Sequence, residues 1–126
     1  MNSKAERRSI WRTGKIKNWD VSYLTQVAQG DDAFFTIVID TFLEHAPLHM
    51  DEILAACQER DWQKLAAAAH KYKSSTANIG LAEIADMPRE IETLARRESG
   101  WSLALKRVSE LEKAHLQIMA DFKEFS

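Results

Sequence analysis

His70 is the residue of this 126-residue sequence whose type and surroundings offer the clearest chemistry. A neutral imidazole keeps a nitrogen lone pair near neutral pH, because its unperturbed pKa is about 6.5, and it can therefore attack an electrophilic centre. Lys71 and Lys73 stand close by in the same segment. Either ammonium group could balance the charge of an anion attached to the ring through a charge-assisted hydrogen bond.

The segment around His70 predicts a helix that is capped by Asp61 and runs to about Thr76. At about 100° per residue, the side of this helix opposite His70 carries the apolar residues Leu65, Ala68, Tyr72 and Ile79. His70 is therefore expected in the middle of the solvent face. Its neighbours on that face are mostly small: Gln63, Ala66, Ala67, Lys73, Ser74 and Ala77. A solvated face ordinarily carries long charged side chains, so the small ones predict a surface that another protein can approach closely.

A plainer interpretation stays open at this point. An alanine-rich helix is simply a good helix, and a lone surface histidine often has no function. Helical periodicity by itself does not identify phosphate chemistry.

The rest of the chain predicts an all-α protein. With four Gly and two Pro, the sequence offers few turns. Apolar residues recur at helical spacing in five stretches, which end or begin at recognisable signals. These stretches are 21–29, 32–60 with Pro47 as a kink or restart, 61–76, 81–97 with Pro88 as a kink, and 102–125. The pattern predicts an antiparallel up-down four-helix bundle with an additional short N-terminal helix.

Composition and charge bound the possible functions. Residues 19–126 are expected to form the bundle, and residues 1–18 a basic arm that is either flexible or an extra helix. The net charge of −2 gives no field for nucleic acid, and no apolar run is long enough for a membrane span. The single cysteine, Cys57, suits a reducing compartment, so we expect a cytoplasmic protein. Met1 and the basic arm favour a free-standing chain.

Four residues at family spacing resemble the His-x-x-Lys-(Gly/Ser)-Ser…Gly signature of histidine-containing phosphotransfer domains: His70, Lys73, Ser75 and Gly80. The continuation is similar to the apolar rhythm and the acidic residue of the next family helix, through Leu81, Ile84, Met87, Ile91 and Glu92. Upstream, the Gly30-Asp31 turn, the Phe42-Leu43 pair, Pro47 and the Asp61-Trp62 helix start are similar as well. The resemblance covers about residues 18–125.

The resemblance implies a role for each matching residue. His70 would accept and donate the phosphoryl group, and Lys73 would balance its charge. Gly80 would be the small residue of the turn after the active helix, and Ser75 a polar residue beside it. Ser74 stands where the family more often has glycine. The expected docking surface comprises Ala66, Ala67, Ser74, Ala77 and Lys71, with apolar residues from the helices near Val21 and Phe35 unless these two pack in the core.

The implied function is that of a phosphorelay intermediate, which takes a phosphoryl group from one receiver-domain aspartate and passes it to another. The partners would be the receiver domains of response regulators and hybrid sensor kinases, which would supply the aspartate and a divalent metal. This chain would bind no cofactor, and since it has no Gly-rich nucleotide loop it should have no kinase or ATPase activity. We expect a monomer with a small interface.

Two other classes compete with this interpretation. The first is a non-catalytic interaction module that keeps the fold but has lost phosphotransfer, and the intact pair of His70 and Lys73 argues against it. The second is a metal-dependent enzyme in a bundle core, which would need inward carboxylates at ligand spacing.

The remaining distinctive residues have structural interpretations. His45 and His49 have the spacing of a metal-binding pair, but Pro47 lies between them and no third ligand is evident, so we expect surface histidines and no metal. His115 is expected to be a hydrogen-bonded core histidine. Cys57 should be a small buried hydrophobe, and the two tryptophans at positions 62 and 101 should anchor helix starts.

Overall fold

The computed structural model describes residues 10–125 of the chain, and these are dominated by five α-helices. The elements are η1 (Ile10–Thr13, a 3₁₀ turn), β1 (Lys15–Ile16), β2 (Trp19–Asp20), α2 (Ser22–Ala28), α3 (Asp32–Glu59), α4 (Trp62–Ala77), α5 (Ala82–Arg96) and α6 (Trp101–Phe125). The two short strands form an antiparallel pair in which Lys15 lies opposite Asp20.

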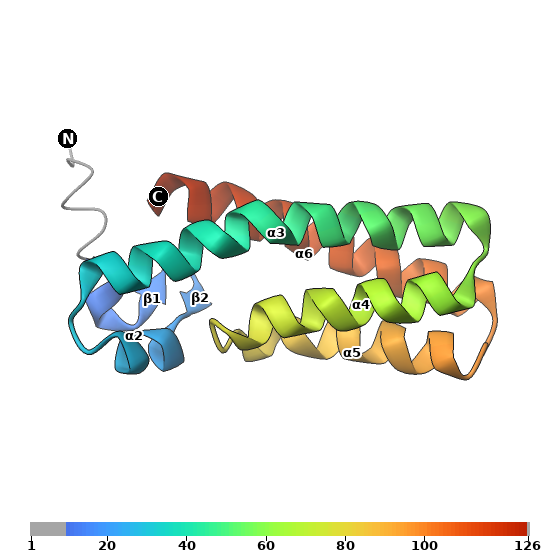
Figure 1. The fold of residues 1–126 in the computed structure, drawn as a ribbon, viewed down its shortest axis with the longest axis horizontal. Helices are drawn as coiled ribbons and strands as arrows, with labels where there is room; N and C mark the ends of the chain where they lie inside the picture. Colours follow the sequence, from blue (N-terminus) through green and yellow to red (C-terminus); the bar gives the residue numbers. More distant parts are fainter. Residues whose placement is uncertain (1–9, 126) are drawn as a thin grey trace.

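Helices α3 to α6 form the four-helix bundle that the sequence predicts. Each helix packs against the next along the chain, and α6 closes the ring by packing against α3. The α3–α4 and α5–α6 connections lie at one end of the molecule, and the α4–α5 turn lies towards the other (Figure 1). The prediction of an up-down bundle preceded by a short helix is confirmed. Among the described residues, no helix combines the length and apolar content needed to cross a membrane.

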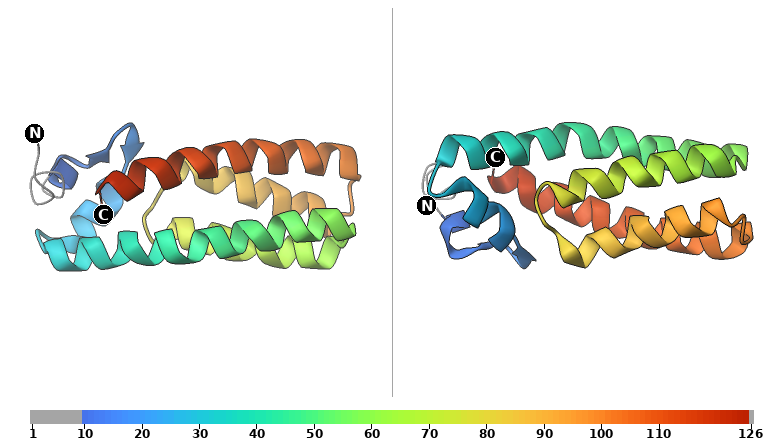
Figure 2. Two further views of the ribbon diagram at one scale, coloured as in Figure 1. Left: turned by 90° about the horizontal axis from the view of Figure 1, so that it is seen from above. Right: turned by 60° about the horizontal axis from the view of Figure 1, so that its bottom comes forward.

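The four helices differ in length, and this difference explains the position of the N-terminal segment. α3 and α6 have 28 and 25 residues, whereas α4 and α5 have 16 and 15. The long pair therefore extends past the α4–α5 turn. α2 and the strand pair occupy the end of the bundle beyond this turn (Figures 1 and 2).

The starts of α3 and α4 follow the capping signals in the sequence, whereas α2 and α5 begin without a side-chain cap. A carboxylate oxygen of Asp31 accepts a hydrogen bond from the backbone N–H of Phe34 at 3.1 Å, and Asp61 accepts from Lys64 at 3.0 Å. Each bond satisfies a donor that the first turn of a helix leaves free.

Pro47 does not restart a helix, so that part of the prediction is wrong. α3 continues through it from Asp32 to Glu59. Proline removes one backbone donor, but the helix on both sides remains tied to the core by Phe42, Ala46 and Met50, all at most 3% exposed. Buried packing on both sides offsets a local defect of this size.

The predicted basic arm is docked where the structure describes it. Ile16 is 5% exposed, the Trp19 indole donates to Asp121 at 2.9 Å, and Lys17 pairs with Glu124 at 2.6 Å. The packed structure thus begins before residue 19, because the apolar side chains of Ile16 and Trp19 reach the bundle once the chain reverses between the strands. Within the described part of this arm, residues 10–18, the helical element is the 3₁₀ turn η1. The basic residues before position 10 lie outside the described residues.

The bundle core contains the residues expected there. Cys57 is 6% exposed, and His115 is 5% exposed with its Nδ1 atom 2.9 Å from the Tyr72 hydroxyl. Trp62 and Trp101 start α4 and α6 and stack at 3.7 Å between ring centroids, which joins the two helix starts. These three predictions are confirmed.

Candidate functional site

His70 lies on the outer face of α4, as its helical position predicts. Its side chain is 54% exposed, whereas Leu65, Ala68 and Tyr72 on the opposite face are at most 2% exposed. The ring is therefore open to a visiting molecule, and the core stripe beneath it holds α4 in place.

The partner of the His70 ring is Glu92, which reaches it from α5. The Nδ1 atom lies 3.2 Å from Oε2 of Glu92 and 3.3 Å from Oε1. Lys73 donates to Oε1 at 2.9 Å, and Arg96 donates to Oε2 from Nε at 3.0 Å and from Nη2 at 2.6 Å. The Glu92 side chain is only 10% exposed, so one nearly buried carboxylate joins the histidine to two cations.

The electrostatics of Glu92 fix its charge. Burial by itself raises the pKa of this carboxyl, but hydrogen bonds from Lys73, Arg96 and His70 outweigh burial and lower the pKa to about 2. Glu92 is thus an anion at neutral pH and can only accept hydrogen bonds. In neutral His70 the proton then sits on Nδ1, and the lone pair is on Nε2, the nitrogen that Glu92 does not hold.

The serines after His70 are satisfied within α4. The Ser74 hydroxyl donates to the His70 carbonyl at 3.1 Å, and Ser75 donates to the Lys71 carbonyl at 3.3 Å. Lys71 turns away from Glu92 and pairs with Glu52 of α3 at 3.0 Å. The structure therefore brings Lys73, but neither Lys71 nor the serine hydroxyls, into the Glu92 network.

Ala66 is a correction to the predicted docking surface. It is 6% exposed, whereas Ala67 and Ala77 are exposed. Ala66 lies on the side of α4 that turns towards α5, where it lines the same groove as Ala95, and the close packing of these two helices covers it. Ala66, one turn before His70, is therefore buried by the contact between α4 and α5 and is not on the open face of α4.

Gly80 occupies the turn between α4 and α5, with φ of +77°. A Cβ atom at this position would lie 2.5 Å from Cβ and 2.7 Å from Cγ of Tyr23 in α2. Both the backbone conformation and the close approach of Tyr23 thus require glycine.

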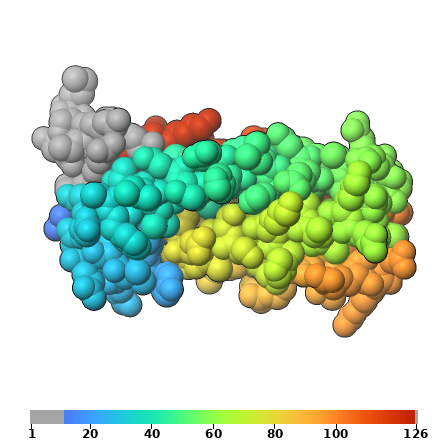
Figure 3. Space-filling view, in the orientation of Figure 1, coloured from blue at the N-terminus to red at the C-terminus, as the bar shows by residue number. Residues whose placement is uncertain are grey.

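An apolar groove of about 300 Å³ lies between α2, α3 and the end of α4. Val21 and Phe35 are fully buried, which favours the core interpretation of these two residues. Their neighbours line the groove with exposed apolar side chains, namely Tyr23, Val27, Phe34 and Ile37, opposite Ser75, Ala77 and Asn78 of α4. Figure 3 shows the face of the molecule on which α2, α3 and α4 meet.

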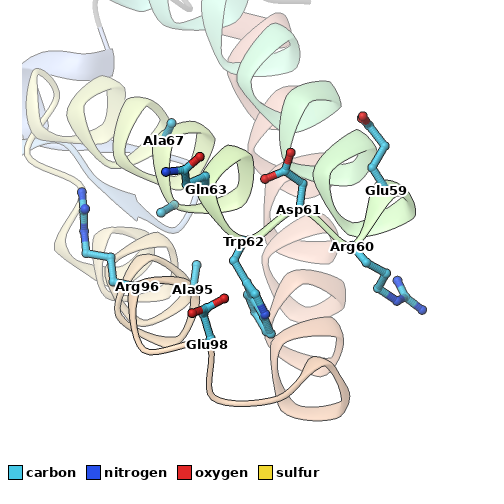
Figure 4. A pocket seen from close by; sticks show the side chains of 10 residues that line it. Glu59, Arg60, Asp61, Trp62, Gln63, Ala67, Ala95, Arg96 and Glu98 are labelled. Atoms are coloured by element: carbon cyan, nitrogen blue, oxygen red, sulfur yellow. The ribbon is translucent and has the colours of Figure 1, made fainter.

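A second groove, of about 780 Å³, lies on the opposite side of α4, towards α5. The part between the two helices is lined by Ala66, Ala67, Ala95 and Arg96, and the rest by Trp62 and the charged and polar residues 59–61, 63 and 98 (Figure 4). The two grooves thus lie near opposite ends of α4, and His70 lies on the stretch of helix between them.

Sequence reasoning assigned no site role to Glu92 or Arg96. Glu92 was noted only as the acidic residue of the helix that resembles the family pattern. Its position in the sequence could have indicated a buried carboxylate, because Glu92 directly follows Ile91 on a helix that also buries Ile84 and Ala95. Arg96 follows at the spacing of four residues that brings a cation over a carboxylate.

His45 and His49 do not form a recognisable metal site. Their rings are 6.4 Å apart, and His49 lies 3.7 Å from Glu52. His49 is only 18% exposed, so the expectation of two surface histidines holds for His45 alone. Within residues 10–125, no group of three or more His, Cys, Asp or Glu side chains is arranged to hold a metal ion.

Comparisons with known proteins place these features in context. The sequence model of one family, described as the Hpt domain, matches residues 38–121. The crystal structure of histidine-containing phosphotransfer protein B from Pseudomonas aeruginosa PAO1 is similar in fold, with a TM-score of 0.74 at 24% identity over 87% of this chain and 95% of that one. No curated protein matches the sequence.

Proposed function

This chain belongs to the Hpt domain family, and from that premise we propose that His70 takes a phosphoryl group from one receiver-domain aspartate and passes it to another. The observation that carries the proposal is the contact of His70 Nδ1 with the ionised Glu92, 3.2 Å away, on a ring that is 54% exposed. This contact holds the ring and directs the reactive lone pair to Nε2.

The transfer can be written as an exchange of one bond. Nε2 attacks the phosphorus of the aspartyl phosphate, the N–P bond forms, and the P–O bond to the aspartate breaks to release its carboxylate. The proton stays on Nδ1, where Glu92 accepts its hydrogen bond and stabilises the positive charge that develops on the ring. Transfer to the next aspartate is the same exchange in reverse.

We assign the other site residues by their contacts. Lys73 keeps Glu92 ionised and supplies positive charge beside the phosphoryl group. Ser74 and Ala77 leave the approach to the ring open because their side chains are short. Gly80 permits the turn that brings α4 and α5 together.

The proposed receiver docks over His70 and the apolar groove beside it. Exposed side chains on α3 continue the groove at helical spacing, from Phe34 and Ile37 to Leu48, which are 41%, 63% and 57% exposed. Exposed apolar residues that lie together are typical of protein interaction sites. A small interface of this kind suits brief encounters, and Lys71 stands at its edge beside Glu52.

The proposal leaves the metal chemistry to the partner. A divalent ion on the receiver would stabilise charge on the group in transfer, and this chain would hold no cofactor and cleave no ATP. We further propose that the protein works as a monomer with response regulators and hybrid sensor kinases. A cytoplasmic location fits the free thiol of Cys57.

Transfer from a phosphorylated receiver domain tests the proposal. We expect an acid-labile, base-stable phosphate on the wild-type protein, bound at Nε2, which ³¹P and ¹⁵N NMR can assign. His70→Gln should lose the label, while His49→Gln, a change at a histidine that lines neither groove, should keep it. Labelling of the His70→Gln protein would reject the assignment, and an unlabelled wild-type protein that still binds the receiver would favour the non-catalytic module.

A further inference from the structure

Arg96 and Lys73 hold the same carboxylate in different ways. Arg96 contacts Oε2 of Glu92, the oxygen that also lies 3.2 Å from the His70 ring, whereas Lys73 contacts Oε1. The guanidinium group and the imidazole are therefore neighbours across a single atom. Arg96 is 62% exposed and Lys73 is 31% exposed, so Arg96 is the cation with more freedom to move.

The net charge of the cluster falls when His70 carries a phosphoryl group. With a neutral ring, one carboxylate and two cations leave a net charge of about +1. A phosphoryl group places about −1.5 to −2 charges within reach of the same side chains, while the ring that keeps its Nδ1 proton gains about +1, so the net charge of the cluster falls to about zero. The anion then competes with Glu92 for a cation.

The surroundings of Arg96 favour it in this competition. It lines the groove of about 780 Å³, and the α4 residues that line this groove with it include Ala66 and Ala67, whose side chains are short (Figure 4). Its planar group can donate two parallel hydrogen bonds to phosphate oxygens, which a single ammonium cannot. Lys73 lies deeper in the seam between α4 and α5.

We propose that Arg96 is an exchangeable cation, which holds Glu92 while His70 is free and turns to the phosphoryl group once His70 carries it. Lys73 stays on Glu92 and keeps the carboxylate ionised and in contact with Nδ1. This inference rests on the proposed function in one respect, that His70 is the phosphorylated residue. It adds that Lys73 acts on the phosphoryl group from its place on Glu92, whereas Arg96 leaves Glu92 and binds the phosphoryl oxygens directly.

The test uses phosphoramidate, a small phosphoryl donor, on the whole protein, so that no receiver is needed. NMR should show the Arg96 Nε–H signal, assigned by its loss in Arg96→Ala, shifting when His70 is labelled. A ³¹P titration should show the phosphoryl pKa rising by about one unit in Arg96→Ala, because a nearby cation favours the dianion. In Arg96→Lys the phosphoryl pKa should lie closer to the wild-type value, because lysine keeps the positive charge although it lacks the planar guanidinium group.

Arg89→Ala is the matched control, because Arg89 is also 62% exposed on α5 but pairs with Asp86. It should leave the phosphoryl pKa unchanged. The inference would be overturned if the Arg96 Nε–H signal did not shift when His70 is labelled, or if the phosphoryl pKa were the same in wild type and Arg96→Ala. Failure of the proposed function would give a different result: phosphoramidate would still label the protein, but a phosphorylated receiver domain would not transfer its phosphoryl group to it.

Discussion

Two histidines of this protein lie on either side of the same helix and have opposite environments. His70 is 54% exposed and its Nδ1 atom faces the anion Glu92. His115 on α6 is 5% exposed, and its Nδ1 atom meets the hydroxyl of Tyr72, only two residues from His70 in the sequence. The same side chain is thus exposed beside an anion in one place, where we propose that it acts as a nucleophile, and is a core hydrogen-bonding group in the other.

The difference between the two sites is electrostatic as well as geometric. Burial lowers the pKa of His115, so its ring is uncharged at neutral pH. The same burial keeps the ring out of reach of another protein. At the other site, hydrogen bonds from Lys73, Arg96 and His70 itself keep Glu92 ionised in spite of its burial. Reactivity here depends on a charged neighbour and an open face, and each can be altered separately.

The largest expected effect follows from removing the charged neighbour. Glu92→Ala should slow phosphoryl transfer by up to about 100-fold, because the ring loses the acceptor that holds it in the reactive orientation. Glu92→Gln should retain part of the rate, since an amide oxygen can still accept from Nδ1. Rapid-quench measurement of transfer from a phosphorylated receiver checks both variants, and a wild-type rate in Glu92→Ala would show that Glu92 does not position the ring.

An intermediate effect, on stability, is expected at the buried histidine. Tyr72→Phe leaves His115 Nδ1 without its partner in the core and should lower the free energy of unfolding by about 1–3 kcal/mol. The transfer rate of the folded protein should change little, because the hydroxyl lies on the far side of α4. Urea unfolding and transfer assays measured on the same samples would separate the two quantities, and a slower rate at unchanged stability would contradict this division.

The smallest effect is a pH dependence with two windows. His115 has a folded-state pKa below its ordinary 6.5, so the unfolded chain binds its proton first and stability falls as the pH drops through that range. Glu92 has a folded-state pKa of about 2 against an ordinary 4.5, so its contribution is present above pH 4.5 and lost as the pH falls towards 2. Urea midpoints across pH 3 to 8 would show both windows, and Glu92→Gln should remove only the lower one.

Much of this arrangement could be predicted from the sequence. The period of the apolar residues and the caps at Asp31 and Asp61 define the helices, and the short connections between them favour an antiparallel bundle. The same period places His70 on the solvent face of its helix. The contact between His70 and Glu92 could not be derived from periodicity, because it depends on how α4 and α5 are rotated against each other. The same rotation buries Ala66, where a helix considered alone predicts exposure.

The packing of Tyr23 against the α4–α5 turn has a consequence for the docking of a receiver domain. There is no room for even a methyl group between Gly80 and the Tyr23 ring, so the joint between the two helices rests directly on α2. Tyr23 also lines the proposed landing surface. A receiver domain that docked on this ring would therefore contact the residue that packs against the turn between α4, which carries His70, and α5, which carries Glu92.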